Sequence, residues 1–320
     1  MNHTLTKLIL TLTFLGQLSG FAQAASAIET GAAIRSSVSE NTLIHDGLRR
    51  SYTVHVPTAS SGKGRVPLVL VLHGGGGNAD NAERMTEFSV KADQEGFIVA
   101  YPEGSGRLNG RFLTWNAGHC CGYAMTHRID DTGFIRALID TLIRDYPIDL
   151  KRVYVTGMSN GGMMAHRLGR ELPDRIAAIA PVVATLFGDE GKPAEPVSAI
   201  MINGQLDTAV PNAGGAPGGR FAGAWDGRPA RPALDQLAFW AAVNGCSNDT
   251  ADDTSGHDRG DYFLWQAHCP AGLATELYVV KNTGHAWPGG RRGTVRADDP
   301  GIPVRATDII WAFFKAHEKR

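Results

Sequence analysis

The sequence predicts an α/β fold in which helices cover both faces of a single, mostly parallel sheet. Residues 66–72 are a continuous apolar run, which is typical of a strand buried on both faces of a parallel sheet, and residues 197–202 predict a further buried strand. Segments with a helical pattern alternate with such runs along the chain, as in doubly wound sheets. The 320 residues contain no internal repeat and no low-complexity linker, so we expect one domain.

The individual elements follow from local patterns. Residues 42–57 predict a hairpin that turns at Asp46-Gly47, a dipeptide favoured in two-residue turns. Asp131 is a candidate N-cap for a helix at residues 131–145, and the pair Asp130-Asp131 is interpreted as capping and loop anchoring rather than as catalytic carboxylates. Further strands are expected at residues 97–101, 153–156, 176–183, 261–266 and 276–280, and further helices at residues 79–94, 234–243, 307–317 and in a run that ends near residue 172.

Composition and charge exclude several classes of partner. With 43% hydrophobic and 20% charged residues, the chain has an ordinary globular composition and enough apolar material for a full core. The formal net charge is -1, with no basic block and no acidic tail. We therefore expect neither nucleic acid nor a membrane surface as a partner.

Residues 1–27 predict a signal peptide. Lys7 precedes an apolar run at residues 8–18, and two A-x-A cleavage patterns follow it. A membrane anchor is disfavoured because the run is too short to cross a bilayer comfortably. No cysteine follows the cleavage patterns, so a lipid anchor is not expected. These features predict secretion to the periplasm or the medium, with a catalytic domain at residues 28–320.

Export makes the four cysteines candidates for disulfides. A bridge between Cys246 and Cys269 would close the loop between a helix and a strand-rich segment. Cys120 and Cys121 are adjacent, and they either form a vicinal disulfide or pair elsewhere, since four cysteines allow three connectivities. His119 stands beside them. Without a second pair of ligands at metal spacing, the sequence predicts neither a metal site nor a cofactor.

The segment Gly157-Met158-Ser159-Asn160-Gly161 joins a β-branched strand to a helical run. A serine on a sharp strand-to-helix turn is the nucleophile elbow of α/β-hydrolases. The flanking glycines leave room for a strained backbone that carries a side chain. The helix N-terminus offers free N–H groups to a developing oxyanion. On this motif alone, a glycine-rich turn after a buried strand is the alternative.

A serine nucleophile requires a base and a carboxylate that orients the base. In α/β-hydrolases these follow in the order Ser, Asp or Glu, His. Asp207 lies just past the predicted strand at residues 197–202, and His285 lies just past the strand at residues 276–280. Active-site loops of open α/β sheets leave the carboxyl ends of strands. Ser159, Asp207 and His285 are therefore expected at one edge of the sheet.

Competing residues occupy less suitable positions. Asp189 follows a segment that is less strand-like, and Asp226 lies within an irregular Gly/Pro-rich tract. The later histidines lie in a polar loop, beside an expected disulfide and in the terminal helix, respectively (His257, His268 and His317). Loop capping is the alternative role for Asp207, and a plain surface position is the alternative for His285.

Two backbone N–H groups are expected to form the oxyanion hole. One belongs to Asn160, whose backbone N–H rather than its side chain is the expected functional group. The other belongs to Gly74 or Gly75, in the run His73-Gly74-Gly75-Gly76-Gly77 that follows a buried strand. A phosphate-binding loop is the alternative, but the run lacks the Lys-Ser/Thr of a P-loop and the spacing of a dinucleotide site.

Two tryptophans are candidates for the walls of the acyl or leaving-group pocket. Trp287 is two residues from His285, so it lies near the site if that histidine is catalytic. Trp115 belongs to a loop whose course the sequence does not define, and core packing is an equal alternative for it.

Together these motifs resemble a known family. The segments His73-Gly-Gly-Gly-Gly77, Cys120-Cys121-Gly122, Gly157-Met-Ser-Asn-Gly-Gly162 and Gly284-His-Ala-Trp-Pro-Gly-Gly290, with Trp115, are similar to those of secreted polyhydroxybutyrate depolymerase-type esterases, which group with feruloyl and acetylxylan esterases. The resemblance runs from Thr42 to the C-terminus and implies a serine esterase with Ser159, Asp207 and His285 as its triad. Depolymerases of solid polyester usually carry a further substrate-binding domain, whereas this chain stops after its last predicted helix. We therefore expect soluble oligomers, or feruloyl and acetyl esters on polysaccharide, to fit at least as well.

The expected function is that of a secreted carboxylic-ester hydrolase that works through an acyl-enzyme on a small-molecule or polymeric ester. An oligopeptidase on the same fold and a catalytically silent polymer- or glycan-binding protein are the alternatives. Comparing ester with peptide substrates separates the first, and binding without turnover would support the second. The complete triad pattern favours the esterase.

Overall fold

The computed structural model describes residues 37–320 apart from 61, 63, 109, 248–255 and 296. The predicted signal peptide at residues 1–27 lies outside the described residues, so export stays a prediction. None of the helices in the described part of the chain combines the length and the apolar character that a bilayer crossing requires.

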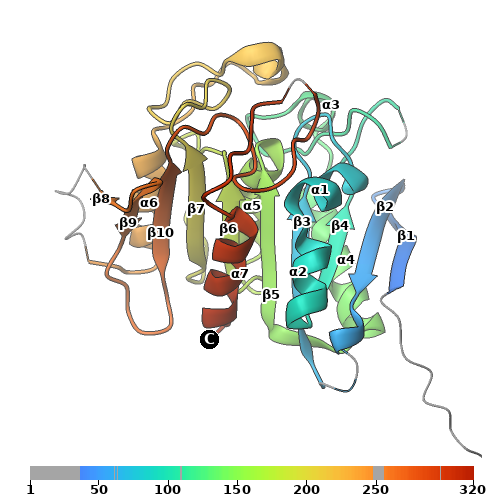
Figure 1. Ribbon diagram of the computed structural model, residues 1–320. Coiled ribbons are helices and arrows are strands. Elements are labelled where there is room, and N and C mark those ends of the chain that lie inside the picture. The colour runs from blue at the N-terminus through green and yellow to red at the C-terminus, as the bar shows by residue number, and fades with distance from the viewer. Residues whose placement is uncertain (1–36, 61, 63, 109, 248–255, 296) are drawn as a thin grey trace, which may run out of the picture. The chain divides into compact units, whose positions relative to one another are not determined.

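Ten strands of the described chain form one sheet in the order β1-β2-β4-β3-β5-β6-β7-β10-β9-β8. The central strands β4-β3-β5-β6-β7-β10 are parallel, and antiparallel pairs extend the sheet at both edges. The predicted fold class is therefore confirmed (Figure 1). The strands are β1 (Ser37–His45), β2 (Leu48–Val56), β3 (Val66–Leu72), β4 (Ile98–Pro102), β5 (Ile148–Met158), β6 (Ala178–Val182), β7 (Ser198–Gly204), β8 (His257–Asp258), β9 (Tyr262–Gln266) and β10 (Thr275–Val280).

Helices cover both faces of the sheet, because the central strands are apolar on both faces. Along β3, Leu68 and Leu70 belong to the core beneath α4, α5 and α6, whereas Val69 and Val71 belong to the core beneath α1, α2 and α7. In Figure 1 the second group of helices lies in front of the sheet and the first group behind it. The helices are α1 (Ala79–Thr86), α2 (Phe88–Glu95), α3 (Gly122–Thr126), α4 (Asp131–Asp145), α5 (Asn160–Glu171), α6 (Ala233–Val243) and α7 (Ala306–Ala316), with short 3-10 helices η1 (Thr58–Ser60) and η2 (Gly219–Ala224).

One predicted helix is in fact two. The pattern at residues 79–94 predicts a continuous helix, but Glu87 takes a left-handed conformation with φ 57°. Its N–H donates to the Glu83 carbonyl and ends α1, and α2 begins at Phe88. Arg291 donates to the Glu87 carboxylate at 2.7 Å from 204 residues along the chain. The residue at the break is thus held by a distant partner, which local helical propensity cannot reveal.

The start of α4 also differs in detail from the prediction. Asp130, not Asp131, is the N-cap, since its side chain accepts a hydrogen bond from the Gly133 N–H at 2.9 Å. Asp131 is the first helical residue, and its buried carboxylate accepts from Arg50 and from the Asn116 N–H, at 2.7 Å each. The interpretation as a cap and a loop anchor is confirmed, with the cap displaced by one residue.

Both cysteine pairs are joined. Cys246, just after α6, is bonded to Cys269, so the predicted pairing is confirmed. Cys120 and Cys121 form a vicinal disulfide, which decides between the alternatives that the sequence leaves open.

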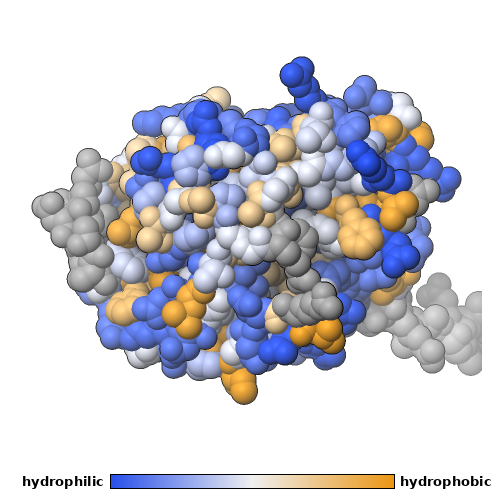
Figure 2. Space-filling view, turned by 90° about the horizontal axis from the view of Figure 1, so that it is seen from above, coloured by the Kyte–Doolittle hydropathy of each residue, from blue (hydrophilic) through white to orange (hydrophobic). Residues whose placement is uncertain are grey.

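The loops that follow β3, β5, β7 and β10 leave the sheet at the same edge, because these strands are parallel. This is the upper edge in Figure 1, where η2 also lies. Figure 2 looks down onto this edge, whose centre is covered mainly by residues of intermediate hydropathy, with hydrophobic patches set apart from one another. The residues that the sequence predicts to be catalytic follow these strands.

Candidate active site

Ser159 occupies a strained turn between β5 and α5. Its φ is 56° and its ψ is -122°, outside the regions that residues with a side chain normally adopt. Its N–H donates to the Val182 carbonyl and its carbonyl accepts from the Met163 N–H, both at 2.8 Å. These bonds fix the turn on both sides. The conformation is that expected of a nucleophile elbow.

Glycines around Ser159 supply the space that this turn needs. A Cβ atom at Gly157 would lie 2.6 Å from the Gly161 carbonyl oxygen, and one at Gly162 would lie 2.7 Å from Ala184 Cβ. Both distances are shorter than non-bonded heavy atoms tolerate. Glycine at these positions therefore lets α5 pack against β5 and the segment after β6.

His285 lies between Ser159 and Asp207. Its Nε2 is 2.9 Å from Ser159 Oγ, and its Nδ1 is 2.7 Å from Asp207 Oδ2. Both distances are those of hydrogen bonds. The structure thus brings together the three residues that the sequence predicts as nucleophile, base and orienting carboxylate.

Asp207 is fixed by its own loop. Its Oδ1 accepts hydrogen bonds from the Ala209 and Val210 N–H groups, each at 2.8 Å, which leaves Oδ2 for His285. The side chain is only 1% exposed, so the carboxylate faces the imidazole rather than water. Loop capping is the alternative role that the sequence allows for this residue, and the geometry shows that one oxygen caps the loop while the other holds the histidine.

His285 is fixed by contacts of its loop with the loop after β7 and by a contact within its own loop. The Gln205 and Leu206 N–H groups donate to the carbonyls of Val280 and Thr283, which ties the loop after β7 to the loop after β10. The His285 N–H donates to Asp298 Oδ2 at 2.6 Å. Sequence reasoning missed Asp298, because nothing in its local pattern marks it as a partner of the site.

The glycine run after β3 lies against the elbow. A Cβ atom at Gly74 would lie 3.6 Å from Ser159 Cβ, and one at Gly75 would lie 3.6 Å from Asn160 Cβ. Asn160 is the first residue of α5, where backbone N–H groups have no acceptor within the helix. The three residues predicted to supply oxyanion donors are therefore neighbours of Ser159.

Comparison with known proteins agrees with this geometry. The family model described as "Esterase PHB depolymerase" matches residues 50–215. The chain belongs to this esterase family.

Individual relatives match a larger part of the chain than the family model does. Feruloyl esterase B of Piromyces equi is 30% identical over 251 residues, 76% of this chain but 44% of that protein, so the chain spans less than half of its length. NocK of Nocardia uniformis subsp. tsuyamanensis is 30% identical over 280 residues, 82% of this chain and 79% of that protein. An acetyl xylan esterase from Aspergillus awamori has a similar fold, with a TM-score of 0.57 and 15% identity over 88% of this chain and 99% of that one.

The two tryptophans predicted to line the pocket lie in the core of the esterase instead. Trp115 is 0% exposed and Trp287 is 1% exposed. The Trp287 indole N–H donates to Thr307 Oγ1 at 3.0 Å, and its ring packs against Phe88. Because buried indoles with a satisfied N–H present no surface to a ligand, direct substrate contact is wrong for both residues. For Trp115 the structure favours the alternative of core packing.

Two further side chains at the site escaped sequence reasoning. Asn160 is 1% exposed and its side-chain amide is hydrogen-bonded to the Trp115 backbone, so this side chain is not incidental. His73 is fully buried, and burial lowers its pKa to about 4, so the imidazole is neutral at pH 7. Their positions next to the serine and next to the glycine run were the only signals in the sequence.

A charged cluster joins the disulfide loop to the segment after η2. His119 Nδ1 lies 2.6 Å from Asp226, its Nε2 lies 2.9 Å from Asp189, and Arg228 also binds Asp189 at 2.9 Å. Burial lowers the pKa of His119, but the hydrogen bonds and charges of the two carboxylates outweigh this effect and raise it overall. Asp189 and Asp226, the competitors of Asp207, are thus bound here. Within the described residues, no group of three or more His, Cys, Asp and Glu side chains is arranged to hold a metal ion.

Proposed function

We propose that the chain is a secreted serine carboxylic-ester hydrolase in which Ser159, Asp207 and His285 form the catalytic triad. The observation that carries this proposal is the position of His285, whose ring nitrogens lie 2.9 Å from Ser159 Oγ and 2.7 Å from Asp207 Oδ2. Membership of the esterase family supports the same chemistry. Secretion rests on the signal-peptide pattern of residues 1–27.

In the proposed acylation step, Ser159 Oγ attacks the ester carbonyl carbon while His285 Nε2 accepts the hydroxyl proton. Asp207 accepts the hydrogen bond from Nδ1–H, which keeps Nε2 free to take that proton and stabilises the imidazolium that forms. The imidazolium then gives its proton to the leaving alkoxide as the ester C–O bond breaks, and the acyl group stays on Ser159. Water attacks the acyl-enzyme by the same route and releases the carboxylic acid.

The carbonyl oxygen carries a negative charge in both tetrahedral intermediates. We assign its stabilisation to the backbone N–H of Asn160 and to that of Gly74 or Gly75. The closeness of this glycine pair to Ser159 and Asn160 supports the assignment, as does the positive end of the α5 dipole. Loss of one such donor costs about 10²–10³ in turnover in other serine hydrolases.

The substrate is proposed to be a small-molecule or polymeric ester. The names of the family and of its relatives indicate hydroxybutyrate, feruloyl and acetylxylan esters. All three classes are carboxylic esters that can transfer an acyl group to serine. A hydroxyalkanoate oligomer or a plant cell-wall ester is therefore the proposed partner, with no nucleic acid and no membrane involved.

The nucleophile is tested with Ser159→Ala, which should abolish hydrolysis of p-nitrophenyl butyrate and leave the unfolding transition unchanged. Ser39→Ala, in β1 at the edge of the sheet, is the control and should retain wild-type turnover. Substantial activity in Ser159→Ala would rule out the nucleophile assignment.

The substrate class is tested with methyl ferulate, acetylated xylan, a hydroxybutyrate oligomer, the solid polymer and a peptide p-nitroanilide. Hydrolysis of one or more esters with no peptide cleavage supports the proposal, and the ranking of kcat/KM selects the class. Preferential cleavage of the peptide would contradict it and favour an oligopeptidase.

A further inference from the structure

We propose that Trp115 and the Asn160 side chain are positioning residues. They hold the two sets of oxyanion donors, the Asn160 N–H on one side and the N–H of Gly74 or Gly75 on the other, in a fixed relation to each other. This inference rests on the proposed function, since it concerns the same oxyanion donors. It gives a role to two side chains that touch no reacting atom. A chain of buried hydrogen bonds connects Asn160 to the glycine run.

The first link is a two-point clamp on the Trp115 backbone. Asn160 Oδ1 accepts from the Trp115 N–H at 2.7 Å, and Asn160 Nδ2 donates to the Trp115 carbonyl at 3.0 Å. Two parallel bonds fix both the distance and the orientation of the groups that they join. The backbone N–H of the same asparagine is one proposed oxyanion donor, so Trp115 is bound directly to the residue that carries this donor.

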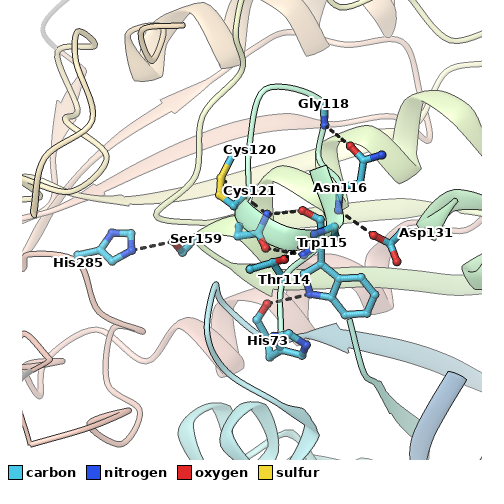
Figure 3. The surroundings of a disulfide bond; sticks show 12 residues. His73, Thr114, Trp115, Asn116, Gly118, Cys120, Cys121, Asp131, Ser159 and His285 are labelled. Carbon is cyan, nitrogen blue, oxygen red and sulfur yellow. Dashed lines mark hydrogen bonds between the residues drawn. A yellow bond between two sulfur atoms is a disulfide. The ribbon is translucent and has the colours of Figure 1, made fainter. Parts of the chain in front are cut away.

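The second link runs from Trp115 to the glycine run. The Trp115 indole N–H donates to the His73 carbonyl at 3.0 Å (Figure 3). That carbonyl and the Gly74 N–H belong to one planar trans peptide, in which C=O and N–H point in opposite directions. By holding the His73 carbonyl, the indole therefore sets the direction of the Gly74 N–H.

The next peptide along the run is fixed independently of Trp115. The Gly74 carbonyl accepts from His73 Nδ1 at 2.8 Å and from the Gly77 N–H at 3.0 Å. His73 Nε2 accepts from the Gly104 N–H at 3.0 Å, which requires the neutral tautomer with its proton on Nδ1. The Gly75 N–H, in the same peptide as the Gly74 carbonyl, thus also has a set direction.

Trp115 itself is firmly held. Its carbonyl also accepts from the N–H groups of Ala117 and Cys121, at 3.1 and 3.0 Å, and its side chain is fully buried. The following residue, Asn116, donates its N–H to the buried Asp131 carboxylate at 2.7 Å. The indole therefore forms a fixed connection between the turn at Ser159 and the glycine run, and it does not line the pocket.

The decisive variant is Trp115→Phe, which keeps an aromatic ring but removes the indole N–H. Without that bond the His73–Gly74 peptide can rotate, and one oxyanion donor is misaligned. We expect kcat to fall about 10- to 100-fold, a part of the effect of losing a donor altogether. KM should change less than threefold, because the interaction is made in the transition state and not in the ground state.

Trp240→Phe is the matched control. Trp240 is also fully buried, and its indole N–H donates to His166 Nδ1 at 2.9 Å in the core beneath α6. Both variants lose one buried hydrogen bond, so their free energies of unfolding should fall by similar amounts. Only Trp115→Phe should lower kcat, and only Trp115→Phe should bind butylboronic acid, a tetrahedral mimic, more weakly by the same factor.

A second pair of variants covers the case in which Trp115→Phe does not fold. Asn160→Asp retains an acceptor for the Trp115 N–H and the backbone N–H at position 160, but removes the donor to the Trp115 carbonyl. Asn244 makes the same two-point clamp on Val197, at 3.0 and 2.9 Å, so Asn244→Asp is its control. Asn160→Asp should lower kcat with little change in KM, and Asn244→Asp should affect stability alone.

The outcomes separate this inference from the proposed function. If Ser159→Ala is inactive but each site variant lowers kcat no more than its control does, the positioning role is overturned and the triad stands. The positioning role is also overturned if Trp115→Phe raises KM at unchanged kcat, which would make the indole a pocket wall. If Ser159→Ala remains active, the proposed function fails whatever the tryptophan variants do.

Discussion

The loops that carry Ser159, Asp207 and His285 contrast with residues 103–129, the long connection between β4 and α4. Each triad residue comes shortly after a strand of the parallel sheet, and its bonds go to nearby residues of the chain, to the end of β6 or to another triad residue. In residues 103–129, with residue 109 not described, the structure shows only the short helix α3 and isolated β-bridges. This connection is held by side chains from elsewhere, among them Asp131 and Asn160.

This difference between the triad loops and residues 103–129 shows that two kinds of interaction hold the candidate active site together. Regular strands deliver the groups that react, so these groups can be changed without disturbing the fold. Buried bonds from side chains to the backbone hold the connection that supports the oxyanion donors. Because an unpaired buried polar group is costly, changes there should affect stability as well as turnover.

The largest effect is expected at the triad. Asp207→Asn should lower kcat about 10⁴-fold, because an amide favours the wrong imidazole tautomer and cannot stabilise the imidazolium. The free energy of unfolding should change little, since Asn can still accept from Ala209 and Val210. Asp93→Asn, which alters the 2.9 Å pair between the exposed Asp93 and the buried His55, is the control and should leave kcat unchanged. Equal kcat in wild type and Asp207→Asn would remove Asp207 from the triad.

A loss of stability is expected at the anchor of the connection. Asp131→Asn leaves the Arg50 guanidinium, only 3% exposed, without a counter-charge. The free energy of unfolding should fall by about 3–5 kcal/mol, as when one partner of a buried ion pair is removed. Urea denaturation measures the change.

Asp174→Asn provides the surface comparison for this anchor. Asp174 binds Arg136 through two hydrogen bonds, but both side chains are more than a third exposed, so the loss should be at most about 1 kcal/mol. Similar losses in Asp131→Asn and Asp174→Asn would contradict the view that buried anchors hold residues 103–129.

The last prediction is that stability falls in acid, which leaves turnover at neutral pH unaffected. Burial lowers the pKa of His73, in the glycine run, to about 4 and that of His166, in α5, to about 3. An unfolded histidine titrates near a pKa of about 6.5, so below that pH the unfolded chain binds protons that the folded chain does not. Stability due to these residues is complete above pH 6.5 and is lost as the pH falls towards 4. At pH 4.5 each should cost roughly 3 kcal/mol.

His73→Gln isolates one of these two contributions, since its amide oxygen can still accept from Gly104. In His73→Gln the free energy of unfolding should fall less between pH 7 and pH 4.5 than it does in wild type. The difference should be roughly the contribution of one histidine. An identical fall in both proteins would show that His73 is protonated in the folded state.

The same contrast explains what the sequence could predict. Residues 66–72 form a strand with the predicted bounds, and Ser159, Asp207 and His285 meet as expected, because strand patterns and the order along the chain are local signals. Sequence reasoning placed Trp115 and Trp287 wrongly, since an aromatic residue near a catalytic motif can face either the pocket or the core.

The remaining features depend on contacts between distant residues. The bonds from Trp115 to His73 and Asn160 span 42 and 45 residues, and the contact that holds Glu87 spans 204. No local propensity encodes such pairs. Asn160 illustrates the limit, because its place after the serine predicted its backbone role while its clamp on Trp115 required the fold.

The most direct test of the proposed triad is covalent labelling with diethyl p-nitrophenyl phosphate followed by peptide mass spectrometry. We predict one diethylphosphoryl group on the peptide that contains Ser159, loss of activity in proportion to labelling, and no labelling of His285→Ala on the same timescale. Full labelling of another residue, or full activity in a protein labelled at Ser159, would contradict the assignment of Ser159 as the nucleophile.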